Sequence, residues 1–322
     1  MIDFFTSIGS AIMTPLYYAI SFVLVGFHNV FGDIFGETSG TAWVLSIIGL
    51  TLVVRAALIP LFVKQIKSSR NMQLIQPKVR ELQKKYGHDR EKLAQETMKL
   101  YKDSGTNPFA SCLPILLQMP IFLALFRMLD QAARKGKAHG FMDTELAGQF
   151  RDAKFFGDIP VSGTLTGGVG GVVVVAAILV VAMTATTFMT QRQLMSKNMP
   201  ADALSGPYAQ QQKLLLYVLP VVFAVGGIAF PIGVLVYWTI SNLWTMCQQF
   251  YVIRNNPAPG TPAAKAKEER DRHKAERHGL KTPAQVEEER LAAEAEAQRE
   301  EKAQARVQPQ RQTKAQRNKK KR

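Results

Sequence analysis

The stretch "LTLVVRAALIPL", residues 50–61, places one arginine, Arg55, inside a run that is otherwise apolar enough for a lipid bilayer. A charged side chain at the bilayer centre costs about 2.5–3.5 kcal/mol on insertion scales. In a helix that ends at Val63, Arg55 lies roughly 12 Å from that end. Arg55 therefore either reaches down to the headgroups with its long side chain or faces a water-filled cavity inside a helical bundle.

The composition around this stretch is that of a membrane protein with charged appendages. Of the 322 residues, 47% are hydrophobic and 20% are charged, yet the mean hydropathy is only −0.02, so the two kinds must be segregated. Residues 1–54 contain no Lys or Arg, whereas residues 253–322 are almost entirely charged or small. Both cysteines, Cys112 and Cys247, lie in apolar segments, which favours buried thiols over a disulfide.

Five stretches are apolar enough, and about long enough, to cross the hydrocarbon core as helices. They are approximately residues 42–63, 112–129, 172–189, 214–230 and 231–253. The last two are separated only by "GGIAFPIG", residues 226–233, and should form a hairpin. An aromatic N-terminal helix within residues 1–41 either lies in the interface or adds a further span. The sequence thus predicts an all-α, polytopic membrane protein with a core of five transmembrane helices at residues 42–253.

The loops predict one orientation. Residues 64–103 carry more than twice as many basic as acidic side chains, which places this loop in the cytoplasm. Charged and apolar residues alternate there at helical spacing around "YGHD", residues 86–89, which predicts a cytoplasmic helical hairpin. Pro77 is expected to begin or kink its first arm. The N-terminal region should lie outside and the C-terminus in the cytoplasm.

The tail, residues 254–322, has the composition of a disordered basic segment. It opens with the linker "NNPAPGTPAA" and lacks the bulky apolar residues that a core needs, so at most residues 284–305 should form a solvated helix. It ends in "KAQRNKKKR", residues 314–322, a cluster able to bind polyanions such as RNA or anionic lipids.

Motifs of catalysis, nucleotide binding and metal binding are missing from the sequence. It has no "GxxxxGK[ST]", "HExxH", "CxxC" or "GxSxG", and its five histidines are scattered. We therefore expect no enzyme, no cofactor and no metal. Asp and Glu are also absent from the five expected spans, which disfavours a proton relay or a cation pump.

Polar residues in the spans favour the cavity over headgroup contact for Arg55. Thr51 lies one turn before Arg55, and Trp238, Ser241, Asn242 and Thr245 are spaced by three and four on one helical face. A Ser or Thr in such a place often only bonds its own backbone. An amide such as Gln118, Gln191 or Asn242 cannot be satisfied so easily in lipid. The candidate site residues are Thr51, Arg55, Gln118, Gln191, Trp238, Ser241 and Asn242.

Three blocks of this sequence resemble a known family. "VVRAALIPLFVKQIKSSR" (53–70), "NPFASCLPILLQMPIFLALFRML" (107–129) and "FPIGVLVYWTISNLWTMCQQFYV" (230–252) are similar to blocks of the YidC membrane protein insertases, relatives of the Oxa and Alb proteins. The resemblance implies a hydrophilic groove, open to the cytoplasm and to lipid, with Arg55 inside it. Thr51, Gln118, Trp238 and Asn242 fall on motif positions expected to line the groove or the path of a client helix.

The resemblance also implies a function, a location and partners. The chain would insert nascent membrane proteins into the bacterial plasma (inner) membrane and help them fold, without nucleotide. A Sec translocon is an expected partner, and the basic tail and cytoplasmic loops could contact a ribosome. The chain shows neither the large periplasmic domain nor the early lipidated Cys of many relatives, which fits an actinobacterial type. The alternatives are an anion transporter or channel and a passive membrane anchor for ribosomes or RNA.

Overall fold

A computed structural model of the chain describes residues 2–105, 113–199, 207–281 and 283–305. The chain forms two units, residues 1–264 and residues 265–322. Helices make up nearly all of the described residues, and the strands among them are limited to β1 (Lys154–Phe155) and β2 (Ile159–Pro160), paired antiparallel.

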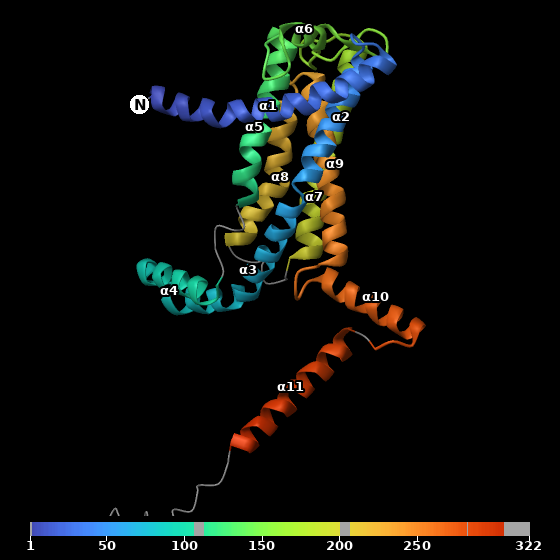
Figure 1. The fold of residues 1–322 in the computed structure, drawn as a ribbon. Coiled ribbons are helices and arrows are strands. Elements are labelled where there is room, and N and C mark those ends of the chain that lie inside the picture. The colour runs from blue at the N-terminus through green and yellow to red at the C-terminus, as the bar shows by residue number, and fades with distance from the viewer. Residues whose placement is uncertain (1, 106–112, 200–206, 282, 306–322) are drawn as a thin grey trace, which may run out of the picture. The chain divides into compact units, whose positions relative to one another are not determined.

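A bundle of five helices forms the body of the first unit (Figure 1). It consists of α2 (Gly40–Ala57), α5 (Leu113–Lys135), α7 (Gly171–Asn198), α8 (Pro207–Gly227) and α9 (Ile232–Asn255). Helix α9 is its centre, because it packs against α2, α5 and α7. At the start of α9, Gly233 leaves room for α6 and the segment before α7: a Cβ there would come within 2.9 Å of the side chains of Phe150 and Val161.

The first four N–H groups of α9 are all paired. The N–H of Ile232 donates to the carbonyl of Gly163 at 2.8 Å. The N–H of Gly233 donates to the carbonyl of Val161 at 2.9 Å. The next two N–H groups donate to the carbonyl of Pro231, at 2.9 and 3.0 Å. A helix normally leaves its first N–H groups without partners. Residues 153–170, between α6 and α7 and called the outer loop after the predicted orientation, therefore cap α9 at Ile232 and Gly233.

Each expected span falls on one helix of the bundle, with one difference. The stretch 42–63 is not a single helix, because α2 ends at Ala57 and α3 (Ile59–Tyr86) begins after Leu58. Pro60, in the first turn of α3, accounts for the break. Proline has no N–H to donate, and its ring clashes with the carbonyl four residues earlier. The helix that begins this span therefore ends at Ala57, while the bounds 42–63 of the span itself stay a prediction.

Three of the described helical segments have the length and hydropathy of a membrane span by themselves. They are Ala11–Phe35 within α1 (Ile2–Phe35), the whole of α2 and the whole of α7. Helix α8 contributes a shorter apolar helix, Gln212–Gly227. The prediction of an all-α, polytopic membrane protein is confirmed. The number of spans stays a prediction.

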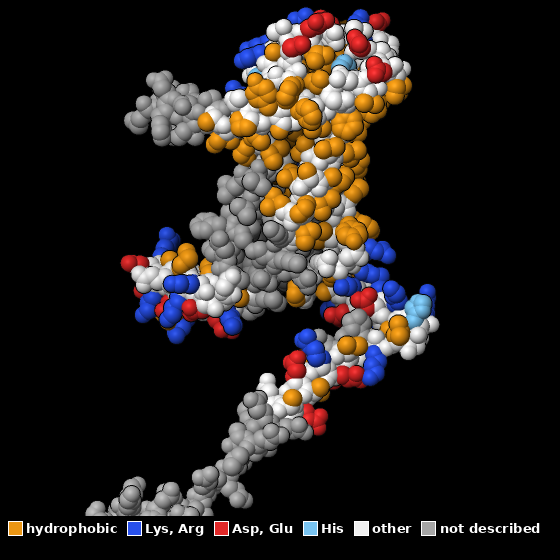
Figure 2. Space-filling view, in the orientation of Figure 1, with side chains coloured by type: hydrophobic (Ala, Val, Ile, Leu, Met, Phe, Trp, Pro, Cys, Tyr) orange, Lys and Arg blue, Asp and Glu red, His pale blue; other side chains and the backbone are white. Residues whose placement is uncertain are grey.

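The surface of the bundle is apolar between two charged ends. Figure 2 shows charged side chains over α6 (Thr144–Asp152) and a wide area of hydrophobic side chains along the bundle below it. On α7, the side chains of Val174, Ile178 and Val181 are 57%, 61% and 66% exposed, at a spacing that keeps them on one face. Such a face suits contact with lipid tails.

Helix α1 runs across one end of the bundle rather than along it (Figure 1). It packs against α2 and α5. The N–H of Phe141, in the loop after α5, donates to Oγ of Ser21 on α1 at 2.8 Å. A Cβ on the neighbouring Gly140 would lie only 2.3 Å from that hydroxyl. This course is compatible with the interfacial alternative for residues 1–41, which stays a prediction.

Aromatic packing joins α1, α2 and α6. Trp43 of α2 is fully buried, stacks on His28 of α1 with ring centroids 3.6 Å apart, and meets Phe150 of α6 edge-on at 5.1 Å. At the start of α2, a Cβ on Gly40 would lie 2.4 Å from the carbonyl carbon of Lys154 in β1. Only glycine allows the two backbones to approach this closely.

The hairpin expected over 64–103 corresponds to α3 and α4 (Arg90–Asp103). The expected turn at "YGHD" lies between them, and Asp89 caps α4 by accepting the N–H of Lys92 at 3.0 Å. Pro77 does not begin the first arm, since α3 starts at Ile59 and continues to Tyr86. The arm follows directly from the helix that carries Arg55.

The described part of the tail contains two helices, of which one was expected and one was not. They are α10 (Pro262–His278) and α11 (Pro283–Ala305), and α11 matches the helix expected around 284–305. Both are rich in the strong helix formers Ala, Glu, Lys and Arg. Ion pairs one turn apart, such as Arg272 with Glu276 at 3.8 Å, add support to α10. The expected polyanion-binding cluster at 314–322 lies outside the described residues.

Candidate functional site

Arg55 contacts the central helix of the bundle. It lies in the last turn of α2, and its Nε donates to Oγ of Ser241 on α9 at 3.1 Å. Its Nη2 donates to the same hydroxyl. The two residues stand 186 positions apart in the sequence and meet because α2 packs along α9. The structure therefore brings together two of the seven predicted site residues by direct contact.

The Arg55 guanidinium is half-buried and has a neutral partner. Within the described ranges no carboxylate pairs with it, and Ser241 is 4% exposed. Tyr237 lies one turn before Ser241 on the same face of α9 and is 3% exposed. Hydroxyl groups relieve the desolvation of a guanidinium only in part, because they carry no net charge. The site keeps a net positive charge, which an anionic or strongly polar group would complement.

Thr51 lies one turn before Arg55 on α2 and does not reach the same partners. It is 1% exposed, and its Oγ1 donates to the carbonyl of Ile47 at 2.7 Å. This bond to its own helix is the common way for a buried Thr to satisfy its hydroxyl. Thr51 therefore packs beneath the Arg55 face without presenting a free donor.

Asn242 joins α9 to α7. Its Nδ2 donates to Oγ1 of Thr187 at 2.9 Å and lies 3.4 Å from the carbonyl oxygen of Met183. The Thr187 hydroxyl in turn donates to that same carbonyl at 2.8 Å. Interhelical bonds of this kind hold membrane bundles together. In this structure, the amide of Asn242 serves the contact between two helices.

Trp238 lies in a cluster of aromatic rings from three helices. Its ring is 4.9 Å from Phe223 of α8 and 5.0 Å from Phe122 of α5, both edge-on. Phe230, in the turn between α8 and α9, stacks on it at 5.7 Å. Phe126 of α5 meets Phe230 edge-on at 5.1 Å. The cluster fills the bundle one turn beyond Ser241 on the outer side.

The two predicted glutamines lie on different helices. Gln118 on α5 and Gln191 on α7 are each half-buried. In the part of the chain that the structure describes, no hydrogen bond joins either amide to Arg55. Gln118 stands one turn before Phe122, on the face that leads to Trp238.

Sequence reasoning missed three members of this neighbourhood. Tyr237 was passed over although it stands four residues before Ser241, a spacing that places both on one helical face. Thr187 gives no specific signal, because a threonine in an apolar helix often bonds only its own backbone. Phe126 carries no polar signal at all, since an aromatic residue in an apolar helix is most often core.

A pocket of the structure lies away from Arg55. Its volume is about 570 Å³, and it opens between the outer loop and the start of α7, lined by residues such as Phe156, Ile159, Val169 and Val172. None of the predicted site residues lines it. Over the described residues, no three His, Cys, Asp or Glu side chains gather as ligands for a metal ion.

The comparison with known proteins covers the part of the chain that contains these residues. The model of the 60Kd inner membrane protein family matches residues 34–259. The membrane protein insertase YidC of Streptomyces avermitilis is 47% identical over 287 residues, which are 86% of this chain and 65% of that protein. The YidC of Bifidobacterium longum is 36% identical over 299 residues, 89% of each chain. A crystal structure of an active YidC insertase has a TM-score of 0.45 and 22% identity, over 72% of this chain and 46% of that one.

Proposed function

This chain belongs to the 60Kd inner membrane protein family, and we propose that it is an insertase that moves membrane proteins into the bilayer and helps them fold. It is an integral protein of the bacterial inner membrane, and its relatives in Streptomyces and Bifidobacterium confirm the actinobacterial type. The relatives' names support neither an anion transporter nor a passive anchor. The chain spans 65% of the length of the Streptomyces relative, so its clients and partners are part of the proposal.

One observation carries the proposal: a half-buried arginine whose hydrogen-bond partner is a hydroxyl and not a carboxylate. A client segment that must cross the membrane has to bring its polar or acidic end through hydrocarbon, which is prohibitive without help. A hydrophilic groove around Arg55 shortens the distance that this end must travel through hydrocarbon. The guanidinium attracts the client's acidic end and releases it again, because Ser241 remains as an alternative partner.

The other predicted residues take roles along the client's path. Gln118 and Gln191 offer amides to the passing backbone, and Trp238 offers a ring face to the apolar part of the client. Asn242 holds α9 against α7 as part of the groove wall, and Thr51 packs within α2 beneath the arginine. The apolar part of the client then leaves sideways into lipid, where its own transfer free energy drives insertion. This route breaks no covalent bond, so no residue is assigned a catalytic role.

Orientation and partners complete the proposal. The basic hairpin α3–α4 and the C-terminus lie in the cytoplasm, by the positive-inside rule. A Sec translocon is a partner for clients with several spans. The basic tail and cytoplasmic loops bring a ribosome close to the groove, through phosphate contacts that salt should weaken.

Reconstitution tests the proposal directly. The purified chain is placed in liposomes without ATP and given a short single-spanning client whose outer tail is acidic. We expect the tail to become protected inside or across the vesicle, and photo-crosslinkers at Gln118 or Trp238 to capture the client. Crosslinks from exposed α7 positions such as Ile178 alone would contradict a route through the groove.

A truncation separates the insertase from the passive anchor. The cut belongs after Ala264, because the N–H of Ala258 donates to Oδ1 of Asn198 at 2.8 Å and Thr261 is fully buried. Removing residues 265–322 should leave insertion of the short client at least partly intact. An anchor that works through its tail would lose all activity in the same assay.

A further inference from the structure

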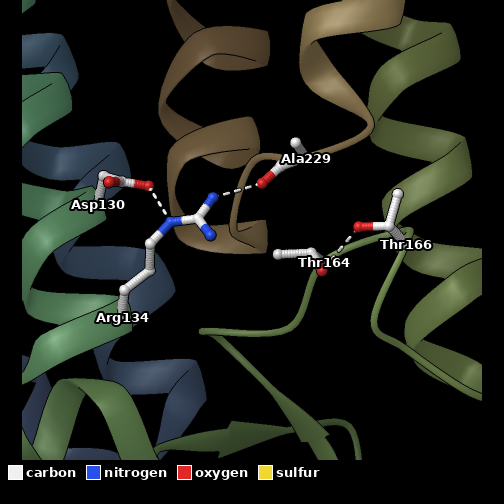
Figure 3. A network of polar contacts seen from close by, with 5 residues as sticks. All are labelled: Asp130, Arg134, Thr164, Thr166 and Ala229. Carbon is white, nitrogen blue, oxygen red and sulfur yellow. Dashed lines mark hydrogen bonds and ion pairs between the residues drawn. The ribbon is translucent and has the colours of Figure 1, made fainter.

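A second arginine joins α5 to the turn between α8 and α9 (Figure 3). The Nε of Arg134 donates to Oδ1 of Asp130, one turn earlier on α5, at 2.6 Å. Its Nη2 donates to the carbonyl of Ala229, 95 positions away in that turn, at 2.5 Å. The planar guanidinium reaches two acceptors at once, which an ammonium on a flexible stem does less well.

The turn is fixed on its other side by the outer loop. The carbonyls of Val161 and Gly163 accept the first N–H groups of α9. The loop is folded locally, since Oγ1 of Thr164 accepts the N–H of Gly167 at 3.1 Å and lies 3.5 Å from Oγ1 of Thr166 (Figure 3). Within the described residues, no hydrogen bond other than that of Arg134 joins α5 to the turn.

Aromatic contacts continue inward from Arg134 to the candidate site. Phe126 of α5 and Phe230 of the turn form the next contact, with ring centroids 5.1 Å apart. Phe230 stacks on Trp238, and Ser241, one turn further along α9, binds Arg55. We call the contacts of Arg134 with Ala229 and of Phe126 with Phe230 the outer seam. The outer seam is thus the outer end of a continuous series of contacts that begins at Arg55.

We propose that Arg134 is a positioning residue for insertion, which holds the outer seam closed until the outgoing end of a client parts it. This inference rests on the proposed function. The contact is suited to opening, because the Arg134 side chain is 44% exposed and water can replace its partners. Because the donor is exposed to water, loss of this hydrogen bond should raise the open population only roughly two- to tenfold.

A distance measurement tests, without any client, whether Arg134 holds the outer seam closed. Both cysteines are replaced by alanine in the full-length chain, and spin labels are attached at Lys135 and Val225, exposed positions on α5 and α8. In liposomes, Arg134→Ala should move part of the distance distribution to larger values, and Arg134→Lys should have a smaller effect. A distribution identical to that of the parent in Arg134→Ala would overturn the proposal.

Two further variants separate the loss of the Arg134 contact from a general disturbance of the fold. Arg151→Ala is the matched control, since Arg151 binds exposed Asp152 at 2.8 Å and does not touch the turn; its distribution should stay that of the parent. Asp130→Asn keeps the bond from Arg134 to Ala229, so it should open the seam less than Arg134→Ala. An equal opening in all three variants would also overturn the proposal.

Insertion of the acidic-tailed client gives the second readout. Initial insertion by Arg134→Ala should be faster than by the parent, by a factor close to the rise in the open population. An unchanged or slower rate with an opened seam would overturn the role in insertion. If the parent inserts no client while Arg134→Ala still opens the outer seam, the proposed function is wrong. The conclusion that Arg134 holds the outer seam closed is then retained.

Discussion

Arg55 donates two hydrogen bonds to the hydroxyl of Ser241, so the one arginine in α2 is held by a neutral group of the central helix. A carboxylate in place of that hydroxyl would neutralise the guanidinium permanently and leave little attraction for a client. The choice of partner thus keeps the charge in place and available.

Substitutions of Arg55 should depend on charge more than on shape. Arg55→Ala should lower the initial insertion rate of an acidic-tailed client about tenfold or more, equivalent to ~1.4 kcal/mol of lost attraction. Arg55→Lys should be milder, because the positive charge remains. Insertion rates in liposomes measure both. Equal losses in the two variants would indicate that the planar geometry matters instead.

Ser241→Ala should change insertion less than Arg55→Ala. The guanidinium loses its hydrogen-bond acceptor but keeps its charge, and water in the proposed groove would replace the hydroxyl. Thr245→Val on the same helix is the control, since the Thr245 hydroxyl donates only to the carbonyl of Ser241, at 2.9 Å. A loss in Ser241→Ala as large as in Arg55→Ala would make the hydroxyl, not the charge, the important group.

Asn242→Ala should destabilise the contact of α9 with α7. Interhelical hydrogen bonds in membranes are worth about 0.6 kcal/mol on average, so the thermal midpoint in detergent should fall by a few degrees. Thr187→Ala should have a similar effect, and the double variant should add little to either, because both remove one bond. Thr184→Val, whose hydroxyl bonds only its own helix at 2.7 Å, serves as the control.

Two glycines should respond oppositely to alanine. In Gly40→Ala the new Cβ would lie 2.4 Å from the carbonyl carbon of Lys154. The start of α2 must then shift, and the stability of the protein should drop. In Gly148→Ala the Cβ meets nothing within 4 Å inside α6, and the gain in helix propensity should stabilise the protein by about 0.4–1 kcal/mol. Thermal unfolding of the two variants against the parent checks the sign of each change.

His139 should make stability depend on pH. Its ring is 4.5 Å from that of Tyr17, and its Nε2 lies 2.8 Å from Oε1 of Gln131. Burial lowers the pKa of His139, and the positive charges of Lys137 and Arg127 lower it further. Between the ordinary pKa of 6.5 and the lower pKa of the folded state, the unfolded chain therefore binds more protons at His139 than the folded chain does. The free energy of unfolding should fall as the pH falls from 6.5 toward the folded pKa.

The measurement compares the parent with His139→Gln. The thermal midpoint of the parent should fall on acidification through 6.5, the ordinary histidine pKa, and the fall should be smaller in the variant. Identical pH profiles would show that protonation of His139 is not linked to folding. Glutamine keeps a polar side chain at the site, so loss of the packing alone cannot produce the difference.

Much of the bundle could be predicted because its signals are local. Five apolar stretches with turn residues between them gave the five helices, and a spacing of three and four placed Trp238 and Ser241 on one face of α9. Pro60 also indicates a helix break, but the apolar residues on both sides favoured one continuous span over two helices. The strands β1 and β2 are two residues long each and leave no periodic pattern.

The contacts that escaped prediction join residues far apart in the chain. Nothing near Arg134 indicates that its second partner is a backbone carbonyl 95 positions away. The direction of the Thr51 hydroxyl was equally hidden, since a threonine can bond its own helix or a neighbour with little difference in energy. Helix α10 was missed for another reason: the lack of bulky apolar residues argues against a core, but local propensity alone supports a solvated helix.

The cap of α9 by the outer loop has a consequence for hydration. A helix that begins near hydrocarbon with bare amides draws a shell of water down with it. Here Val161, Gly163 and Pro231 take up the first four donors, so this entrance of α9 offers solvent nothing to bind. The water that the proposed groove needs around Arg55 should therefore enter from the opposite end of the bundle.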